Sequence, residues 1–181
     1  MNRVVCSLLV VAFAPAISFA QAQVPAPSTN PVADALRQGL ARSAKNMTAA
    51  AEAMPPEKFS FKPTASQNSY GHLIVHISES NFRFCSAVSG VAAPELPKLS
   101  ETDAKEKLLA AVRSSFDFCS SSLGKLDDSR LADSVELFAG RSFTRAAAIL
   151  LLSGSWADHY TEQAMYLRLN SILPPTAQPA K

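Results

Sequence analysis

The sequence lacks several features, and each absence excludes a class of protein. It contains no glycine-rich phosphate loop, no Cys-x-x-Cys and no Gly-x-Ser-x-Gly, so the common motifs of nucleotide binding, dithiol redox chemistry and serine esterases are missing. Lys and Arg number 17 against 15 Asp and Glu. A charge so nearly balanced predicts no nucleic acid partner and no acidic membrane surface.

Long apolar runs are also missing after the N-terminus. The chain begins with a positive charge at Arg3, continues with the apolar run "VVCSLLVVAFA" and reaches the small residues "SFA". This layout is typical of a secretory signal peptide. We expect residues 1–20 to be the signal, with cleavage after Ala20 or, alternatively, after Ala22, and a periplasmic or secreted mature protein. No later run reaches about 20 residues, so we expect no stable membrane insertion after cleavage.

The remaining chain has the length of a single domain with flexible ends. Residues 21–29 are rich in Pro, Ser and Ala, which predicts a flexible leader. The composition of residues 176–181 predicts a disordered tail. The folded domain is therefore expected over residues 30–175.

Four stretches carry apolar residues at helical spacing, and strand signals are weak. Asn30 and Ser69 are suitable N-caps for the first two, and a capping-box-like start precedes the third. The helices are expected at about 31–54, 70–87, 100–123 and 142–172, with "SVELFAG" as a short extended piece before the last. Two longer connections between four amphipathic helices predict an all-α four-helix bundle. The residues expected to be buried together are Leu36, Ile77, Phe84, Val112, Phe116, Ile149 and Trp156, and the apolar stripes also include Val32 and Leu150.

Two cysteines remain after signal cleavage, Cys85 and Cys119. An even number of cysteines in an exported chain favours a disulfide, which would link the second and third helices. The alternative is a pair of buried free thiols that act as small apolar residues.

Two segments resemble the DinB/YfiT-like superfamily, in particular its exported members. They are "SYGHLIVHISESNFRFC" on the second helix and "DHYTEQAMYLRLNSILPP" on the fourth. The resemblance extends from about Pro31 to Pro175 and implies a DinB/YfiT-like four-helix bundle. Related bundles often pair, so it also implies a homodimer. Relatives include thiol-dependent transferases and isomerases, and many have no known activity.

Members of this superfamily often bind a divalent metal through one histidine of the second helix and two of the fourth. By resemblance, His76 matches the first of these ligands and His159 matches the last. Ser155 stands where the remaining histidine is expected, and Thr161 stands where the family usually has glycine. The resemblance therefore implies a zinc, nickel or manganese site from which one ligand is missing.

The helical spacing leads to a related hypothesis about all three histidines. His76 lies at the edge of an apolar stripe, about 60° round the helix from Leu73, and His159 has the same offset from Trp156. Both side chains are therefore expected to face one pocket. His72 precedes His76 by four residues, as in many metal-ligand pairs, and is a candidate replacement for the ligand lost at Ser155.

Other ligands and a simpler arrangement also fit the pattern. Glu79 and Glu162, each three residues after a histidine, are alternative third ligands. Without a metal, His72 is a solvated residue, and His76 and His159 hydrogen bond to each other or to Ser155. The sequence thus allows a metal-dependent transferase or hydrolase, a non-catalytic periplasmic binding or structural bundle with a degenerate metal site, and a metal-free bundle that binds a small molecule.

Overall fold

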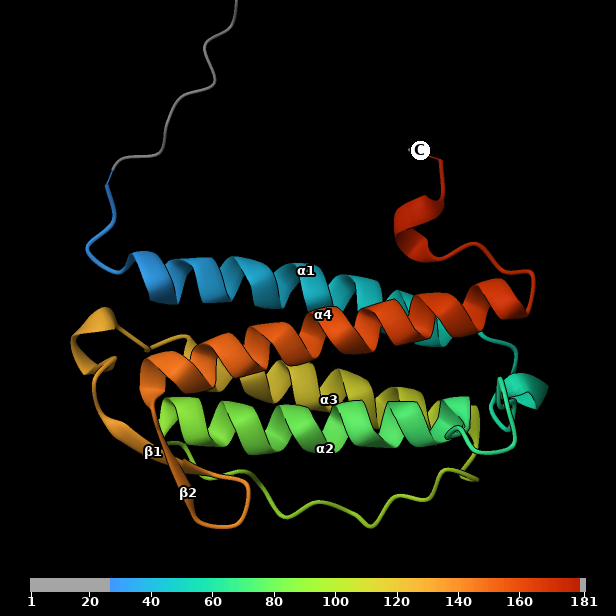
Figure 1. The fold of residues 1–181 in the computed structure, drawn as a ribbon, viewed down its shortest axis with the longest axis horizontal. Helices are drawn as coiled ribbons and strands as arrows, with labels where there is room; N and C mark the ends of the chain where they lie inside the picture. Colours follow the sequence, from blue (N-terminus) through green and yellow to red (C-terminus); the bar gives the residue numbers. More distant parts are fainter. Residues whose placement is uncertain (1–26, 180–181) are drawn as a thin grey trace, which may run out of the picture.

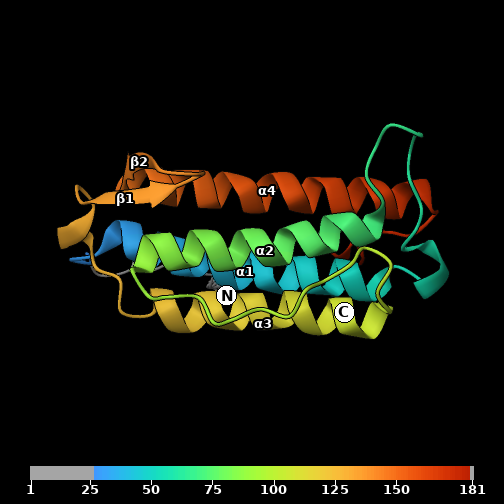
Figure 2. The ribbon, with the colours of Figure 1, turned by 90° about the horizontal axis from the view of Figure 1, so that it is seen from below.

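The computed structural model describes residues 27–179, which form a bundle of four long helices (Figures 1 and 2). The predicted signal peptide and most of the leader lie outside these residues. The bundle confirms the expected all-α fold. The helices are α1 (Pro31–Ala53), α2 (Tyr70–Ser89), α3 (Lys105–Leu123) and α4 (Arg145–Leu169), and a hairpin of β1 (Ser134–Leu137) and β2 (Arg141–Thr144) precedes α4.

The order of the helices places α2 beside α4. Each helix packs against two others, so the neighbours around the bundle are α1, α4, α2 and α3. Helices α1 and α4 run in one direction and α2 and α3 in the other (Figure 1). Residues 90–104 therefore return along the length of the bundle to start α3, and α2 and α4 are antiparallel neighbours.

The N-terminus of α1 is capped from a distant part of the chain. Asn30 occupies the N-cap position, but its side chain makes no capping hydrogen bond. Instead, the Asp128 carboxylate accepts hydrogen bonds of 2.9 Å from the backbone N–H groups of Val32 and Ala33. Asn30 Oδ1 in turn accepts from the Asp128 N–H at 3.0 Å. The prediction that the Asn30 side chain caps this helix was wrong, because a carboxylate from the α3–β1 connection takes that role.

Helix α3 begins later than its capping-box-like sequence predicts. Ser100 and Asp103 form a turn in which the Ser100 N–H donates to Asp103 Oδ2 at 2.8 Å and the Asp103 N–H donates to the Ser100 carbonyl at 3.0 Å. The helix itself starts at Lys105. The capping residues are thus used in a turn before the helix.

The start of α4 also differs from the prediction, because residues 141–144 pair with β1. The extended "SVEL" segment expected from the sequence is β1, and its partner strand was assigned to the helix. Phe138, Ala139 and Gly140 reverse the chain with positive φ angles of 47°, 57° and 87°. Thr144 then ends β2 and accepts a hydrogen bond of 3.2 Å from the Ala147 N–H, which fixes the start of α4.

The core between the helices contains all seven residues predicted to be buried together. Two other stripe residues are at the surface: Val32 is 37% exposed and Leu150 is 73% exposed. Helix α4 carries apolar residues on more than one face, so periodicity alone did not identify its buried side. No helix within residues 27–179 combines the length and apolar character needed to cross a membrane.

Helices α2 and α3 are also joined by a covalent bond. The sulfur atoms of Cys85 and Cys119 are bonded, and the two residues are 34 positions apart in sequence. This bond is consistent with the predicted disulfide. Both cysteines are fully buried.

Candidate functional site

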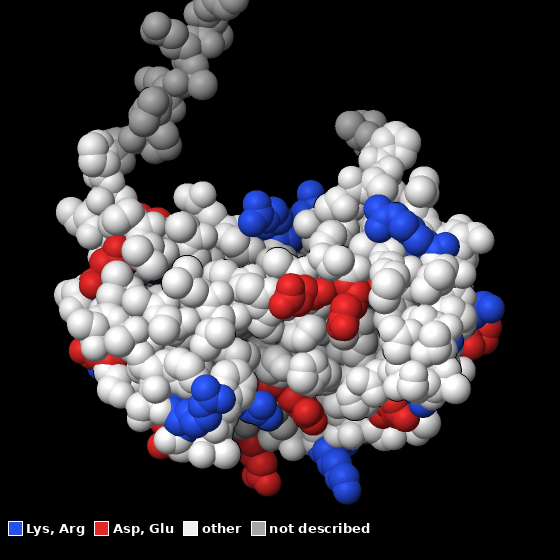
Figure 3. All heavy atoms as spheres, in the orientation of Figure 1, with Lys and Arg blue, Asp and Glu red and all other residues white. Residues whose placement is uncertain are grey.

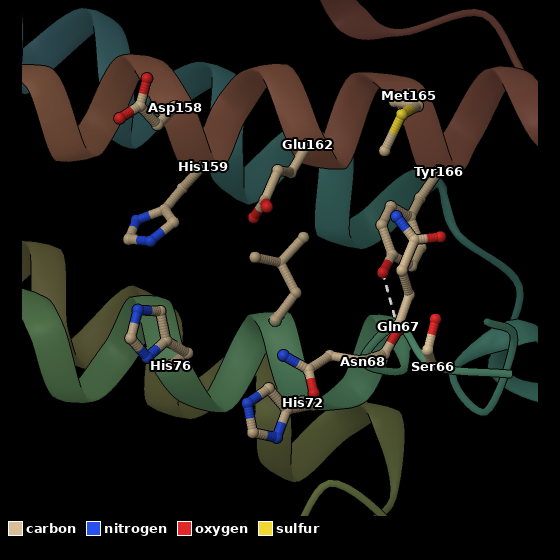
Figure 4. Close-up of a pocket in the computed structure, with 11 residues that line it drawn as sticks. Ser66, Gln67, Asn68, His72, His76, Asp158, His159, Glu162, Met165 and Tyr166 are labelled. Atoms are coloured by element: carbon tan, nitrogen blue, oxygen red, sulfur yellow. Dashed lines mark hydrogen bonds between the residues drawn. The ribbon is translucent and has the colours of Figure 1, made fainter. Parts of the chain in front are cut away.

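His76 of α2 and His159 of α4 lie together on the facing sides of the two helices (Figure 4). Their ring centres are 5.0 Å apart and their planes are nearly perpendicular, at 86°. Both rings line a cavity of about 470 Å³ between α2 and α4. The structure thus brings the two histidines into one pocket.

Each ring of this pair has one nitrogen close to a serine hydroxyl on its own helix. Ser155 Oγ lies 3.3 Å from His159 Nδ1, and Ser80 Oγ lies 3.5 Å from His76 Nε2. No group in residues 27–179 hydrogen bonds to the second nitrogen of either ring. The serines orient the imidazoles and leave His159 Nε2 and His76 Nδ1 available for a ligand.

The environment of His159 keeps its imidazole neutral. Burial, the largest cause, and the neighbouring His76 together lower the pKa of His159 from 6.5 to about 4, against the opposing effect of the Asp158 carboxylate. At neutral pH the ring therefore carries one N–H donor and one nitrogen acceptor.

His72 lines the same cavity but is held toward a different group. Its ring stacks on that of His76, with centres 6.4 Å apart and planes 7° from parallel. Its Nδ1 lies 3.7 Å from the Glu101 carboxylate, which also accepts a hydrogen bond of 2.7 Å from the Ser69 hydroxyl. Ser69 caps α2, as predicted, by accepting a hydrogen bond from the His72 N–H. These contacts draw His72 toward the α2–α3 connection and away from His159.

The other candidate ligands lie at different places. Glu162 lines the cavity together with the three histidines. Glu79 lines a separate hollow between α2, α3 and residues 96–99. Ser155, at the position of the missing histidine, contacts His159 through its hydroxyl.

These residues do not supply the three protein ligands of the metal site with which the resemblance compares them. Within residues 27–179, no three His, Cys, Asp or Glu side chains are grouped so that they could hold one ion. His76 and His159 converge, but His72 is turned to Glu101, and a serine replaces the further histidine. Catalytic zinc sites use three protein ligands, and this donor set supplies two.

The opposite end of the cavity is formed by residues that sequence reasoning did not identify. Ser66, Gln67 and Asn68 of the α1–α2 connection line it, as does Tyr166 of α4. The Tyr166 hydroxyl donates a hydrogen bond of 2.7 Å to the Asn68 carbonyl. The connection has polar turn residues directly before α2, but only the packing of Tyr166 against it shows that they reach the pocket.

Comparisons with known proteins agree with this architecture. A sequence model of the DinB superfamily matches residues 40–162, a span that contains His76 and His159. No curated protein matches the chain.

Among solved structures, a DinB-like protein from Bacillus subtilis aligns with a TM-score of 0.64 and 20% identity, covering 80% of this chain and 99% of the other. A DinB-like protein from Bacillus cereus ATCC 10987 aligns with a TM-score of 0.64 and 12% identity, covering 78% of this chain and 95% of the other. At these identities the two structures support the shared fold alone. The family match extends over most of the chain, which therefore belongs to the DinB superfamily.

Proposed function

We propose that this chain is a small-molecule-binding bundle whose site is the cavity between α2 and α4. The observation that carries the proposal is the pair of imidazoles, His76 and His159, which meet from two helices in a cavity of about 470 Å³. This volume is within the usual range of ligand pockets, about 300–1,000 Å³. The free ring nitrogens would orient a polar group of the ligand, and the remaining walls would enclose its body.

The chain contains three histidines, which makes this proposal directly testable. In the mature protein without a histidine tag, the three ring C–H signals can be followed by NMR while fragments of different chemistry are added. A fragment in the pocket is expected to shift the His76 and His159 signals at the same concentration. His76→Ala should weaken binding of that fragment. A fragment that saturates the protein and shifts neither signal would contradict the proposed site.

A second candidate function is metal binding through an open, two-histidine site. The ring separation favours it: two imidazoles that share a tetrahedral ion have centres about 5 Å apart, given metal–nitrogen distances of about 2.0–2.1 Å. The serine contacts would also support metal ligation, because ligating imidazoles usually hydrogen bond through their second nitrogen. Zinc, nickel or manganese would then take its other ligands from water or a bound molecule.

Metal titration separates the two candidates. If the metal site is real, metal-free protein should bind one of these ions at micromolar concentration, and both His76→Ala and His159→Ala should abolish binding. His72→Ala is the matched control, since His72 is a half-exposed histidine on α2 that contacts Glu101. Absence of binding to the unaltered protein would leave the metal-free pocket as the proposed site.

A further inference from the structure

The charged groups that line the pocket are acidic. Its eleven lining residues include Asp158 and Glu162 but no lysine and no arginine. These two are the acidic residues of α4, and Figure 3 shows acidic groups side by side over this helix, with Lys and Arg side chains elsewhere on the same face. The charge nearest the imidazoles is therefore negative.

The two carboxylates differ in direction, although they are four residues apart on one helix. Figure 4 shows the Glu162 carboxylate directed from α4 toward α2, beside His159, and the Asp158 carboxylate on the side of α4 away from α2. Burial raises the pKa of the Tyr166 hydroxyl, and the Glu162 carboxylate, which lines the same cavity, raises it as well. Within residues 27–179, Glu162 has no salt-bridge partner, so its charge remains available to a ligand.

We infer that the pocket selects a small organic cation, an amine on a short alkyl stem, and that Glu162 is the residue that selects it. This inference rests on the proposed binding function of the pocket and adds the ligand class. The ammonium group would donate hydrogen bonds to the Glu162 carboxylate and to an imidazole nitrogen, because an ionised carboxylate only accepts and an ammonium only donates.

The apolar residues of the pocket suit the stem of such a ligand. Leu73 lines the cavity from α2, and Met165 lines it from α4. An alkyl chain between these two side chains would bury apolar surface while the ammonium group faces Glu162. An anion of the same size would place its charge beside Glu162 and be repelled.

Three probes of similar size and different charge test the inference: butylammonium, 1-butanol and butyrate. Each is titrated into metal-free mature protein in the presence of EDTA, and the ring signals of His76 and His159 are followed by NMR. Butylammonium is expected to bind with saturation. Butyrate and 1-butanol are expected to bind at least about tenfold more weakly, because neither can form a favourable charge contact with Glu162. Raising the salt concentration should weaken butylammonium binding and leave that of 1-butanol unchanged.

Two matched variants identify the responsible carboxylate. Glu162→Gln and Asp158→Asn each remove one negative charge from the same exposed face of α4. Glu162→Gln should reduce butylammonium affinity about tenfold, and Asp158→Asn less than about threefold, since the Asp158 carboxylate lies on the side of α4 away from α2. Equal losses in the two variants would overturn the role of Glu162.

The outcomes also separate this inference from the function on which it rests. Saturable binding of butyrate or 1-butanol as tight as that of butylammonium, with both histidine signals shifted, would retain the pocket as a binding site and overturn the cationic class. Absence of a shift with all three probes would overturn the cationic class, and the proposed binding function would then fail if the broader fragment set also shifted neither signal.

Discussion

Two polar residues of α2 meet the neighbouring helices in opposite ways. The Asn81 side chain donates to Ser115 Oγ at 2.9 Å and accepts from Trp156 Nε1 at 2.8 Å, and Cys85, one turn further on, is bonded to Cys119. His76 faces His159 in a cavity of about 470 Å³. Asn81 thus joins three helices through paired polar atoms, and His76 leaves a ring nitrogen free for a ligand.

This difference suggests that stability and binding depend on separate parts of one helix. A buried donor or acceptor that already has its partner contributes to a fixed core, and a group without a partner can take a ligand. Loss of a core side chain or of a fully paired polar group should therefore lower the free energy of unfolding, and loss of His76 should lower ligand affinity. The predictions below test this separation, beginning with the largest expected effect.

Loss of a core side chain of α2 should have the largest effect on stability. Ile77 is fully buried, so Ile77→Ala is expected to lower the free energy of unfolding by about 2–5 kcal/mol. Leu150→Ala is the control, because Leu150 is 73% exposed and its loss should change stability by less than about 0.5 kcal/mol. Denaturant titration measures both values, and a similar loss in the two variants would contradict the assignment of the core.

Removal of the link between α2 and α3 should have the next largest effect. For a closed loop of this length, reduction of the Cys85–Cys119 bond or the double substitution to alanine should lower the free energy of unfolding by about 2–4 kcal/mol. The pocket histidines should keep their ligand response at temperatures where the protein stays folded. The mature protein should also show no free thiol before reduction. Two titratable thiols in denatured, unreduced protein would contradict this prediction.

Asn81 and His76 allow the most direct contrast between a residue whose polar atoms have partners and one with a free ring nitrogen. Asn81→Ala leaves the Trp156 indole N–H without its acceptor, so it should cost about 1–3 kcal/mol of stability. His76→Ala removes a group that already lacks a partner for one nitrogen, and its cost should be smaller, below about 1 kcal/mol. For ligand affinity, measured on the folded proteins, His76→Ala should have the larger effect. A larger effect of Asn81→Ala in both measurements would show that stability and binding do not depend on separate residues of α2.

Acid should lower the stability of the protein by a smaller amount, through His159 on the α4 side of the pocket. The folded pKa of His159 is about 4, below the value of 6.5 for the unfolded chain, so the unfolded state binds more protons between these pH values. Stability should therefore be constant above about pH 6.5, fall as the pH decreases and level off below about pH 4. Because the ring is partly solvated, we expect a loss of about 1 kcal/mol. His159→Gln should reduce this part of the pH dependence, and an unchanged profile in that variant would assign it to other groups.

The sequence predicted the bundle because the signals for it are local and repeated. Apolar spacing placed Ile77, Phe84 and Trp156 in the core, and Ser69 marked the start of α2. Signals that depend on distant segments were missed. Asp128, which caps α1, lies 96 positions from Val32. Residues 141–144 carry no strong strand signal and become a strand by pairing with β1.

The sequence predicted only part of the pocket, because only part of it depends on local signals. The angular offsets of His76 and His159 from their apolar stripes suffice to place both on the facing sides of two helices. The position of His72 depends on Glu101, which returns to α2 through the long α2–α3 connection. Likewise, the wall at Asn68 and Tyr166 depends on how the α1–α2 connection packs. Export and pairing of two copies remain predictions.

The most direct test of the account is the titration of the three histidine rings by NMR, in the unaltered protein and in His76→Ala. If His76 and His159 share one pocket, the His159 signal should titrate near pH 4, and His76→Ala should raise the His159 pKa toward 6.5 because one source of the shift is removed. His72→Ala, which removes a neighbouring ring that does not face His159, should leave the His159 pKa nearly unchanged. Titration of His159 near 6.5 in the unaltered protein, with no response to His76→Ala, would show that the two rings do not share a pocket.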